Sequence, residues 1–291
     1  MQRMMWRFAG RLGRVLSLVL LAALGSIILM RYAPGYFTDS REMDAAYAEG
    51  ARVRLSSLHD TQGSLPALLR SQLGGWIHGD LGRSRHYDVP VAGLLRERSA
   101  TTARLLLQGI GTGWLIAFAF ALLLSARRTD RGELLLASST ATLLAIPAGV
   151  LAMLSLLMNK GGPVLVLALL IAVRDFKLLY RLLRTSWRAP YLLQARAQGF
   201  SFFQTARVHL LPVVGFELLA IAMMSLVLAL SALVPVEVVF DVPGLGQLAW
   251  SAATNRDLPV LVAVTAVLAA CIGLASLIAA PDRATEAAQC A

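Results

Sequence analysis

The sequence predicts an all-α integral membrane protein with six transmembrane helices and both termini in the cytoplasm. Its 291 residues are 57 % hydrophobic and only 15 % charged, and the mean hydropathy is +0.65. A soluble domain of this length does not need so much apolar material. Uncharged apolar runs recur along the chain, and most are long enough to cross a bilayer as helices. Arginine and lysine gather in the short segments on one side of these runs, which is typical of cytoplasmic connections.

The first apolar run, residues 15–30, follows an N-terminal arm that carries four arginines. Such a segment is either a signal peptide or a first membrane helix. No convincing small-x-small cleavage site follows, and the run continues into Arg31 and Tyr32. We therefore favour an uncleaved first helix. Residues 33–100 then mix Gly, Pro, Asp and Arg without a stretch that could span, so they predict an extramembrane region.

The second run, residues 105–126, carries Gly109, Gly111 and Gly113. Glycines at such spacing let membrane helices approach one another closely. Glycine is also simply tolerated inside membrane helices, so the sequence leaves both interpretations open.

The third and fourth runs are less regular. The third covers residues 134–158 and contains Pro147, which we expect to kink the helix. The fourth is uncharged only over residues 163–173, and Arg174 and Asp175 follow it. Eleven residues are too few to cross a bilayer, so this helix must continue past the charges if it spans at all.

The fifth and sixth runs, residues 213–236 and 260–280, are long and clear, although Glu217 lies about one turn inside the fifth. An ionisable group inside a span costs a few kcal/mol unless it faces a polar interior. Glu217 could line a polar path or pair with the cluster of Arg174 and Lys177. The interpretation that we favour is a hydrogen bond to another helix.

The distribution of positive charge orients the predicted bundle. Basic residues concentrate in the N-terminal arm, in the turn at 127–131 and in the stretch 181–207. The connections at 159–162 and 240–259 carry one basic residue each. Lys and Arg are retained on the cytoplasmic side, so both termini are predicted to be cytoplasmic. Long loops are translocated largely regardless of charge, so the arginines of residues 33–100 do not alter this orientation.

Several classes of function have no support in the sequence. The net charge of +10 comes with no aromatic-interleaved basic patch of the kind that binds nucleic acid. Cys271 lies inside an apolar run and Cys290 is the penultimate residue, so we expect no intrachain disulfide. The four histidines are scattered, and we expect neither a metal nor a cofactor. No phosphate-binding loop, nucleophile elbow or metalloprotease motif occurs, so we do not expect an enzyme.

The most informative segment is a basic stretch, residues 184–212, between two apolar runs. In it Gly199 follows the small residues Ala195 and Ala197, and Pro212 lies thirteen positions after Gly199. A loop that transmits force from a motor must be a short rigid helix seated in a groove. Small residues permit the close approach, and glycine lets the backbone turn. A basic helix on the membrane surface without a partner is the alternative.

This stretch resembles the cytoplasmic coupling loop of ATP-binding-cassette importer permeases, written Glu-Ala-Ala, three residues, Gly, nine residues, Ile-x-Leu-Pro. Three more segments resemble the permeases of the peptide and nickel importers. Gly-Asp-Leu-Gly-Arg-Ser at 79–84 is similar to the segment that leads into their second helix, and Ala-Ile-Pro at 145–147 to the proline motif of their third. The most specific match is to their loop between helices five and six, at residues 237–246 and 255–260. The resemblance covers nearly the whole chain in order.

The resemblance implies the permease subunit of an ATP-driven, binding-protein-dependent importer for peptides or similar small solutes, in the bacterial inner membrane. Its partners would be a second permease subunit, two cytoplasmic ATPase subunits, a periplasmic solute-binding protein and the lipid bilayer. ATP hydrolysis would belong to the separate subunits and would drive alternating access. The implied regions are the N-terminal arm and first helix (1–32), a periplasmic loop region (33–100), a permease core (101–282) and a cytoplasmic tail (283–291).

The resemblance also assigns candidate residues. For coupling to the ATPase these are Ala195, Arg196, Ala197, Gly199, His209 and Pro212. For the periplasmic loop they are Glu237, Phe240, Pro243, Gly244, Gly246, Arg256 and Asp257. In that loop residues 243–246 have a composition typical of turns, because proline fixes φ and glycine allows positive φ. Because they lie within predicted spans, the intramembrane polar candidates are Glu217, Arg174 and Asp175.

The sequence departs from the family pattern in several places. Leu-Gln-Ala at 193–195 replaces Glu-Ala-Ala, and the stretch 186–191 is shorter than in relatives by about one helical turn. Charges at 174–177 fall where relatives are apolar. A divergent membrane scaffold or assembly protein that does not transport is therefore the alternative function. A membrane-embedded enzyme is disfavoured because the spans lack convergent catalytic groups.

Overall fold

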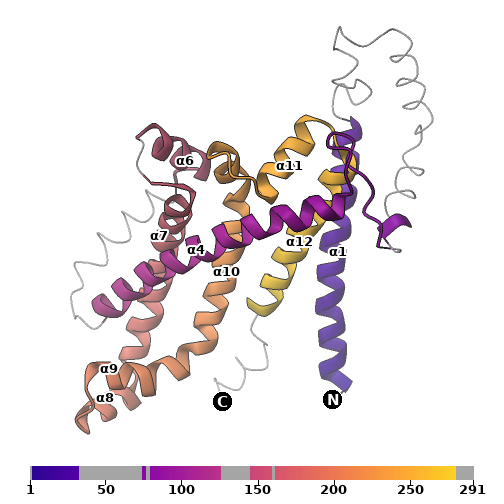
Figure 1. The fold of residues 1–291 in the computed structure, drawn as a ribbon. Coiled ribbons are helices and arrows are strands. Elements are labelled where there is room, and N and C mark those ends of the chain that lie inside the picture. The colour runs from indigo at the N-terminus through magenta and orange to yellow at the C-terminus, as the bar shows by residue number, and fades with distance from the viewer. Residues whose placement is uncertain (1, 33–73, 77–78, 126–144, 159–160, 280–291) are drawn as a thin grey trace, which may run out of the picture. The chain divides into compact units, whose positions relative to one another are not determined.

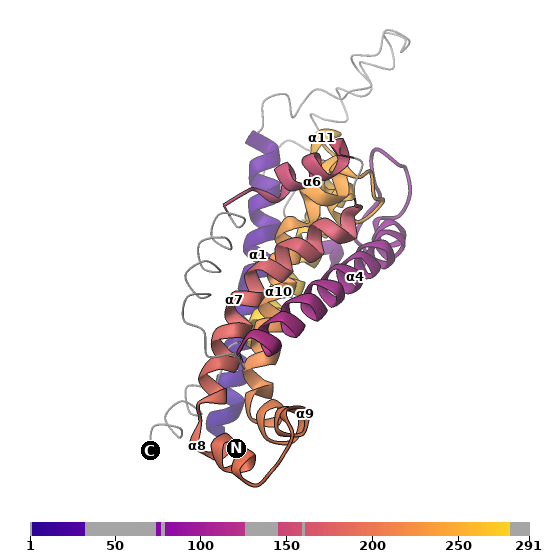
Figure 2. The same cartoon turned by 90° about the vertical axis from the view of Figure 1, so that its left-hand side faces the viewer.

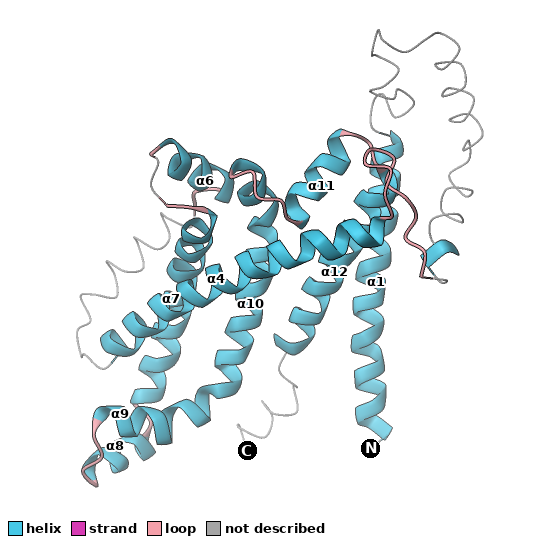
Figure 3. Ribbon diagram, viewed as in Figure 1, coloured by secondary structure: helices cyan, strands magenta, loops and turns pink. Residues whose placement is uncertain are grey.

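The structure, a computed structural model, describes residues 2–32, 74–76, 79–125, 145–158 and 161–279. Within these ranges the chain is almost entirely helical (Figure 3), as the sequence predicts, with one isolated β-bridge between Arg83 and Pro90. Most of the predicted extramembrane region 33–100, namely residues 33–73, lies outside the described residues. The basic turn at 127–131 and the tail 283–291 also lie outside them.

The elements follow one another as labelled in Figure 1. The long helices are α1 (Gln2–Tyr32), α4 (Val91–Ser125), α7 (Pro163–Trp187), α10 (Leu211–Val239) and α12 (Leu258–Ala279). The shorter ones are α6 (Ala148–Leu157), α8 (Pro190–Ala197), α9 (Phe202–Thr205), the π-helix η1 (Ala206–Leu210) and α11 (Leu245–Thr254). They form two compact units, the first made of Met1–Thr102 and Val242–Gly273 and the second of Ala103–Asp241 and Leu274–Ala291.

Four helical segments of the described chain have the length and apolar composition to cross a membrane: Gly10–Met30, Val91–Ser125, Phe202–Val239 and Leu258–Ala279. They correspond to the first, second, fifth and sixth predicted spans. For the fourth, α7 continues past the charges as required and reaches 25 residues. For the third, α6 has 10 described residues. The crossing by these two runs, and the side of each terminus, stay predictions.

The predicted kink at Pro147 is wrong, because the helix begins after this residue. Pro147 has an extended backbone (φ −59°, ψ 143°) and directly precedes α6. Its carbonyl accepts hydrogen bonds from the amides of Val150 and Leu151, at 3.0 and 3.2 Å. Proline suits a helix start, since the amide hydrogen that it lacks would have no partner there. Pro235, by contrast, lies in the interior of α10.

The second helix starts earlier than its apolar run. Residues of the predicted extramembrane region, from Val91 onward, already form the first turns of α4. Val91, Leu94 and Leu95 are buried, whereas Arg96 and Glu97, which follow them, are exposed. Apolar residues at this spacing cover one helix face, which explains why a segment rich in charge is helical.

In the first unit, α1 packs antiparallel to α12. Ala23, Ile27 and Met30 of α1 form a buried cluster with Leu258 and Val262 near the start of α12. At the other end of α12, a Cβ on Gly273 would lie only 2.9 Å from the side chain of Val15. The two helices therefore contact each other between Val15 and Met30 of α1, and Gly273 of α12 makes the approach possible next to Val15.

In the second unit, α7 and α10 run side by side and α4 packs against α7 (Figures 1 and 2). A Cβ on Gly109 would lie 2.8 Å from the Cβ of Leu167, and one on Gly113 would lie 2.8 Å from the carbonyl oxygen of Ala168. Gly111 meets nothing within 4 Å. The close-packing interpretation therefore holds for Gly109 and Gly113, which lie on one helix face, and simple tolerance holds for Gly111.

This difference predicts opposite outcomes for matched substitutions in α4. Gly113→Ala forces a methyl group against backbone of α7, and we expect it to destabilise the protein by about 1–3 kcal/mol, as overpacking does. Gly111→Ala should leave stability unchanged or raise it slightly, since alanine is the better helix former. Thermal unfolding of the detergent-purified variants, followed by circular dichroism, measures both. Equal effects of the two substitutions would contradict this account of the α4–α7 packing.

Candidate functional site

The basic segment between α7 and α10 folds as a compact group of short helices. α7 ends at Trp187, and Pro190 begins α8, whose eight residues correspond to the predicted coupling helix. α9 and η1 then lead directly into α10. Figures 1 and 2 both place α8 and α9 together at one end of α7 and α10. The sequence prediction of a short helix in this segment is confirmed.

Gly199 ends α8 with a left-handed backbone turn. Its φ is +88°, and a Cβ there would meet nothing within 4 Å, so the backbone conformation and not a lack of space calls for glycine. The amide of Phe200 donates to the carbonyl of Ala195 at 3.4 Å. This is the Schellman pattern that closes helix C-termini. The prediction that Gly199 turns the backbone is confirmed.

The next helix has its own start signal. The amide of Gln204 donates to the Ser201 hydroxyl at 3.4 Å, and the Gln204 side-chain oxygen accepts from the amide of Ser201 at 3.0 Å. This reciprocal capping box satisfies two amides that an unpaired helix start would leave open. The turn between α8 and α9 is therefore defined by hydrogen bonds at both ends.

The Leu-Pro pair follows a π-helical turn. The amide of Leu211 bonds to the carbonyl of Ala206, five residues back, and not four. Pro212 has no amide hydrogen, and in a regular helix its ring crowds the carbonyl four residues earlier. A widened turn immediately before it relieves this conflict. The proline therefore continues into α10 without breaking the helix.

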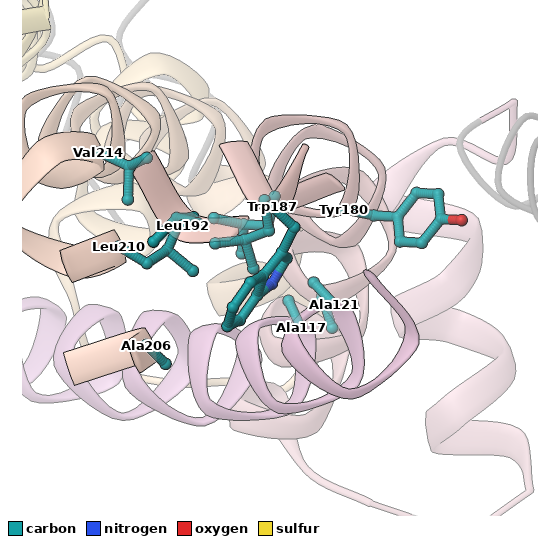
Figure 4. Packing of buried hydrophobic residues seen from close by; sticks show 11 residues of the cluster. Ala117, Ala121, Tyr180, Trp187, Leu192, Ala206, Leu210 and Val214 are labelled. Carbon is teal, nitrogen blue, oxygen red and sulfur yellow. The ribbon is translucent and has the colours of Figure 1, made fainter. Parts of the chain in front are cut away.

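A buried apolar cluster fixes this segment to the long helices (Figure 4). The Trp187 and Phe202 rings stack with centroids 5.0 Å apart and planes inclined by 16°. Leu192 of α8 and Leu210 of η1 are fully buried. The cluster extends to all three long helices of the second unit, through Ala117 and Ala121 of α4, Leu179, Tyr180 and Leu183 of α7, and Val214 of α10. One side of α8 is thus packed against the second unit.

The predicted coupling residues do not all face the same way. Ala195 is buried against the unit, whereas Ala197, Gly199 and Pro212 are exposed. His209 is half-buried, its ring contacts Phe200 edge-on at 5.3 Å, and its Nε2 atom has no hydrogen-bond partner among the described residues. The side chain of Arg196 lies outside what the structure describes. The face open to a partner therefore includes Ala197 and excludes Ala195.

In the first unit, two family-like segments far apart in sequence contact each other. The Asp257 carboxylate is completely buried and accepts from the Ser84 hydroxyl and from the amide of His86, the latter at 3.2 Å. The Ser84 oxygen in turn accepts from the amide of Tyr87 at 2.9 Å. Nearby, Gly82 (φ +83°) packs against Pro259, to whose Cβ its own Cβ would lie at 3.7 Å. The 79–84 and 255–260 motifs thus form one structural element.

The predicted periplasmic loop contains more helix than the sequence suggests. Glu237 lies in the last turn of α10 and is buried, and Phe240 caps that helix. Gly244 is extended (φ −115°) and starts α11, and Gly246 lies inside α11. The expectation of positive φ at these glycines is wrong, since Asp241 takes it instead (φ +51°).

The start of α11 is fixed by a contact that the sequence does not reveal. The amide of Leu245 donates to the Thr102 hydroxyl oxygen at 2.8 Å, although the two residues are far apart in the chain. Among the described residues, no group of three acidic, histidine or cysteine side chains could hold a metal ion.

Comparison with known proteins decides the family. Residues 109–284 match the family of binding-protein-dependent transport system inner membrane components. The chain belongs to this permease family. Two further relatives, proteins of Brucella ovis and Brucella suis biovar 1 named provisionally as peptide permease proteins, are each 25 % identical over 304 aligned positions. Each alignment covers 92 % of this chain and 92 % of the relative. The resemblance to importer permeases is therefore confirmed.

The contacts of Glu217, Arg174 and Asp175 differ from those predicted from the sequence. Glu217 is exposed in α10, and neither the ion pair with Arg174 or Lys177 nor the favoured inter-helix hydrogen bond is found among the described residues. Arg174 donates to the carbonyl of Met224 at 2.9 Å. Asp175 is completely buried and accepts from the Ser225 hydroxyl. The sequence predicts Arg174 and Asp175 as polar candidates but does not predict their partners in α10.

Two double-mutant cycles can compare the coupling free energy of a buried side-chain pair with that of an exposed ion pair. The Ser84–Asp257 pair is buried, so we expect a coupling free energy of about 1–2 kcal/mol from the cycle of Ser84→Ala and Asp257→Ala. The neighbouring Arg83–Asp88 ion pair is 3.5 Å long, and its side chains are 68 % and 87 % exposed. Its cycle should give less than about 0.5 kcal/mol. Thermal unfolding in detergent provides the values, and equal couplings would show that the buried Ser84–Asp257 contact stabilises the fold no more than the surface ion pair does.

Proposed function

We propose that this chain is one of two permease subunits of an ATP-driven importer for peptides or similar small solutes in the bacterial inner membrane. The family match supports a binding-protein-dependent transport component. The names of the two Brucella relatives support peptides as the solute class. The partners would be a second permease, two cytoplasmic ATPase subunits and a periplasmic solute-binding protein. Six helices would cross the membrane, with α6 and α7 belonging to the third and fourth crossings.

The observation that carries the proposal is the construction of α8. A Schellman turn ends this helix, and the capped helix α9 follows it. Leu192 attaches α8 to a buried cluster that three long helices share. Its other side, including Gln194 and Ala197, is exposed. A helix with one face fixed to a membrane bundle and one face free is suited to receive a push from a motor subunit. ATP-driven closure of the ATPase pair would move it and switch the helices between inward-facing and outward-facing states.

In this proposal the 79–90 and 240–259 segments form the periplasmic side, where the binding protein delivers substrate. The buried Asp257 ties the two segments together, so they would respond as one element. Substrate would then pass between this chain and the second permease. Peptide identity would be selected mainly by the binding protein.

The proposed topology can be tested with single cysteines. Because Cys271 is exposed, the background should carry Cys271→Ser and Cys290→Ser. In intact cells, a membrane-impermeant maleimide should label Ala253→Cys of α11 and spare Ala197→Cys of α8. Inverted membrane vesicles should show the reverse pattern. Labelling of position 197 from outside the cell would overturn the orientation and, with it, the coupling role of α8.

Docking of the ATPase can be tested with a matched pair of substitutions. Ala197 and Ala253 are both exposed alanines in short helices, in α8 and α11 respectively. Ala197→Trp should lower the amount of ATPase recovered with the affinity-purified permease about tenfold, which corresponds to about 1.4 kcal/mol of lost binding. Ala253→Trp should recover the wild-type amount. Mass spectrometry of proteins purified from native membranes provides the readout. Failure of the wild-type chain to recover any ATPase would favour a non-transporting scaffold.

A further inference from the structure

α7 and α10, the two helices that flank the α8 segment, are joined by adjacent polar contacts. Arg174 of α7 donates from its guanidinium to the carbonyl of Met224 at 2.9 Å. The next residue, Asp175, accepts from the hydroxyl of Ser225, the residue after Met224. Two consecutive residues of one helix therefore hold two consecutive residues of the other. Such a pairing fixes both the rotation and the sliding of one helix against its neighbour.

The third long helix of this unit takes part as well. The indole Nε1 of Trp114 in α4 donates to the Ser225 oxygen at 3.0 Å. Asp175 and Ser225 are both completely buried, and the Oδ1 atom of Asp175 has no hydrogen-bond partner among the described residues. The contact is therefore a small polar network inside an otherwise apolar interface.

The setting of Asp175 argues against a role in stability alone. It occupies the centre of a buried stripe at four-residue spacing whose other members are Leu167, Ile171, Leu179 and Leu183. A leucine at this place would continue the stripe. A partly satisfied buried polar network is commonly less stabilising than apolar packing, and its best-attested use is to fix the register between helices.

The position of the network along the helices matches this use. At 1.5 Å per residue, Asp175 lies roughly 20 Å from the end of α7, and Ser225 lies roughly 20 Å from the start of α10. The polar contact thus joins the two helices at nearly equal distance from the α8 segment. The cluster around Trp187 already joins the same helices at the α8 end. Two joints at different heights prevent one helix from pivoting on the other.

We propose that Arg174 and Asp175 are positioning residues that latch α7 to Met224 and Ser225 of α10, so that both helices follow the movement of α8 as one body. This inference rests on the proposed function, because it takes α8 as the element that the ATPase moves. Without the latch, the push on α8 would separate or rotate α7 and α10 before it reached the rest of the unit.

The latch can be tested by measuring the separation of the two helices. Nitroxide labels at Arg181→Cys of α7 and Leu219→Cys of α10 are suitable, since both positions are exposed and lie between the latch and α8. The background again carries Cys271→Ser and Cys290→Ser. Electron–electron double resonance is recorded on the chain in lipid nanodiscs, first alone and then, where an ATPase co-purifies, in the complex with and without Mg-ATP and vanadate.

With the latch intact, one narrow distance population should persist in every state. Asp175→Ala should raise a second, separated population about three- to tenfold, as expected for the loss of one hydrogen bond between membrane helices. Ser225→Ala should raise it at least as much, because it also removes the acceptor of the Trp114 indole. Asp175→Asn should restore the narrow distribution, because the amide oxygen still accepts from the Ser225 hydroxyl. Ser231→Ala is the matched control, since Ser231 is an exposed serine of the same helix that bonds only to the carbonyl of Val227 in its own helix.

Unchanged distributions in Asp175→Ala and Ser225→Ala, with normal helicity by circular dichroism, would overturn the latch. Broadening by Ser231→Ala to the same extent would also overturn it, since the effect would then be general to α10. The measurement on the chain alone separates this inference from the proposed function. If the latch variants change the distances in the isolated chain but no ATPase co-purifies, the importer is contradicted and the latch is supported. If an ATPase co-purifies but the latch variants leave the distances unchanged, only the latch is contradicted.

Discussion

The arrangement of the second unit depends on the burial of Trp187 at the junction of α7 and the short helices. Its ring stacks on Phe202, and the surrounding cluster draws on α4, α7, α8, η1 and α10. α8 and α9 are too short to be stable as isolated helices in water. Their order must therefore come from this packing and from the hydrogen bonds at their ends. The side of α8 that carries Gln194 and Ala197 is exposed, while the opposite side is fixed in this way.

Two kinds of contact hold the long helices together, namely close backbone approach and buried polar contacts. Gly109 and Gly113 let α4 lie directly against α7. Such contacts depend on van der Waals packing, which in lipid replaces the hydrophobic effect as the source of helix association. Polar contacts, from Asp257 in the first unit and Asp175 in the second, add direction to this packing. Each of these carboxylates connects segments that are distant in the chain.

The helical class, four helices long and apolar enough to cross a membrane, and the turn at Gly199 could all be predicted from composition, apolar run length and residue type. Two predictions of local backbone geometry were wrong, and the distant partners of the polar residues were not predicted. Pro147 starts a helix and does not kink one, and no local signal separates these outcomes in an apolar run. Positive φ was expected at the glycines of 243–246, but Asp241 adopts it after α10 ends. The sequence also gives no sign of which distant residue a single polar side chain will contact. It therefore could not identify the hydrogen-bonding partners Ser84, Thr102, Ser225 and Trp114.

The π-helical turn of η1 has a consequence for every residue that follows it. It accommodates one residue more than an α-helical turn does. Because successive residues of an α-helix are about 100° apart around its axis, that additional residue sets which side of α10 faces its neighbours. A chain lacking one residue between 206 and 210 would present Ser225 and the other inward residues of α10 in a different direction. The length of this short stretch is therefore constrained as strictly as the identity of any side chain in it.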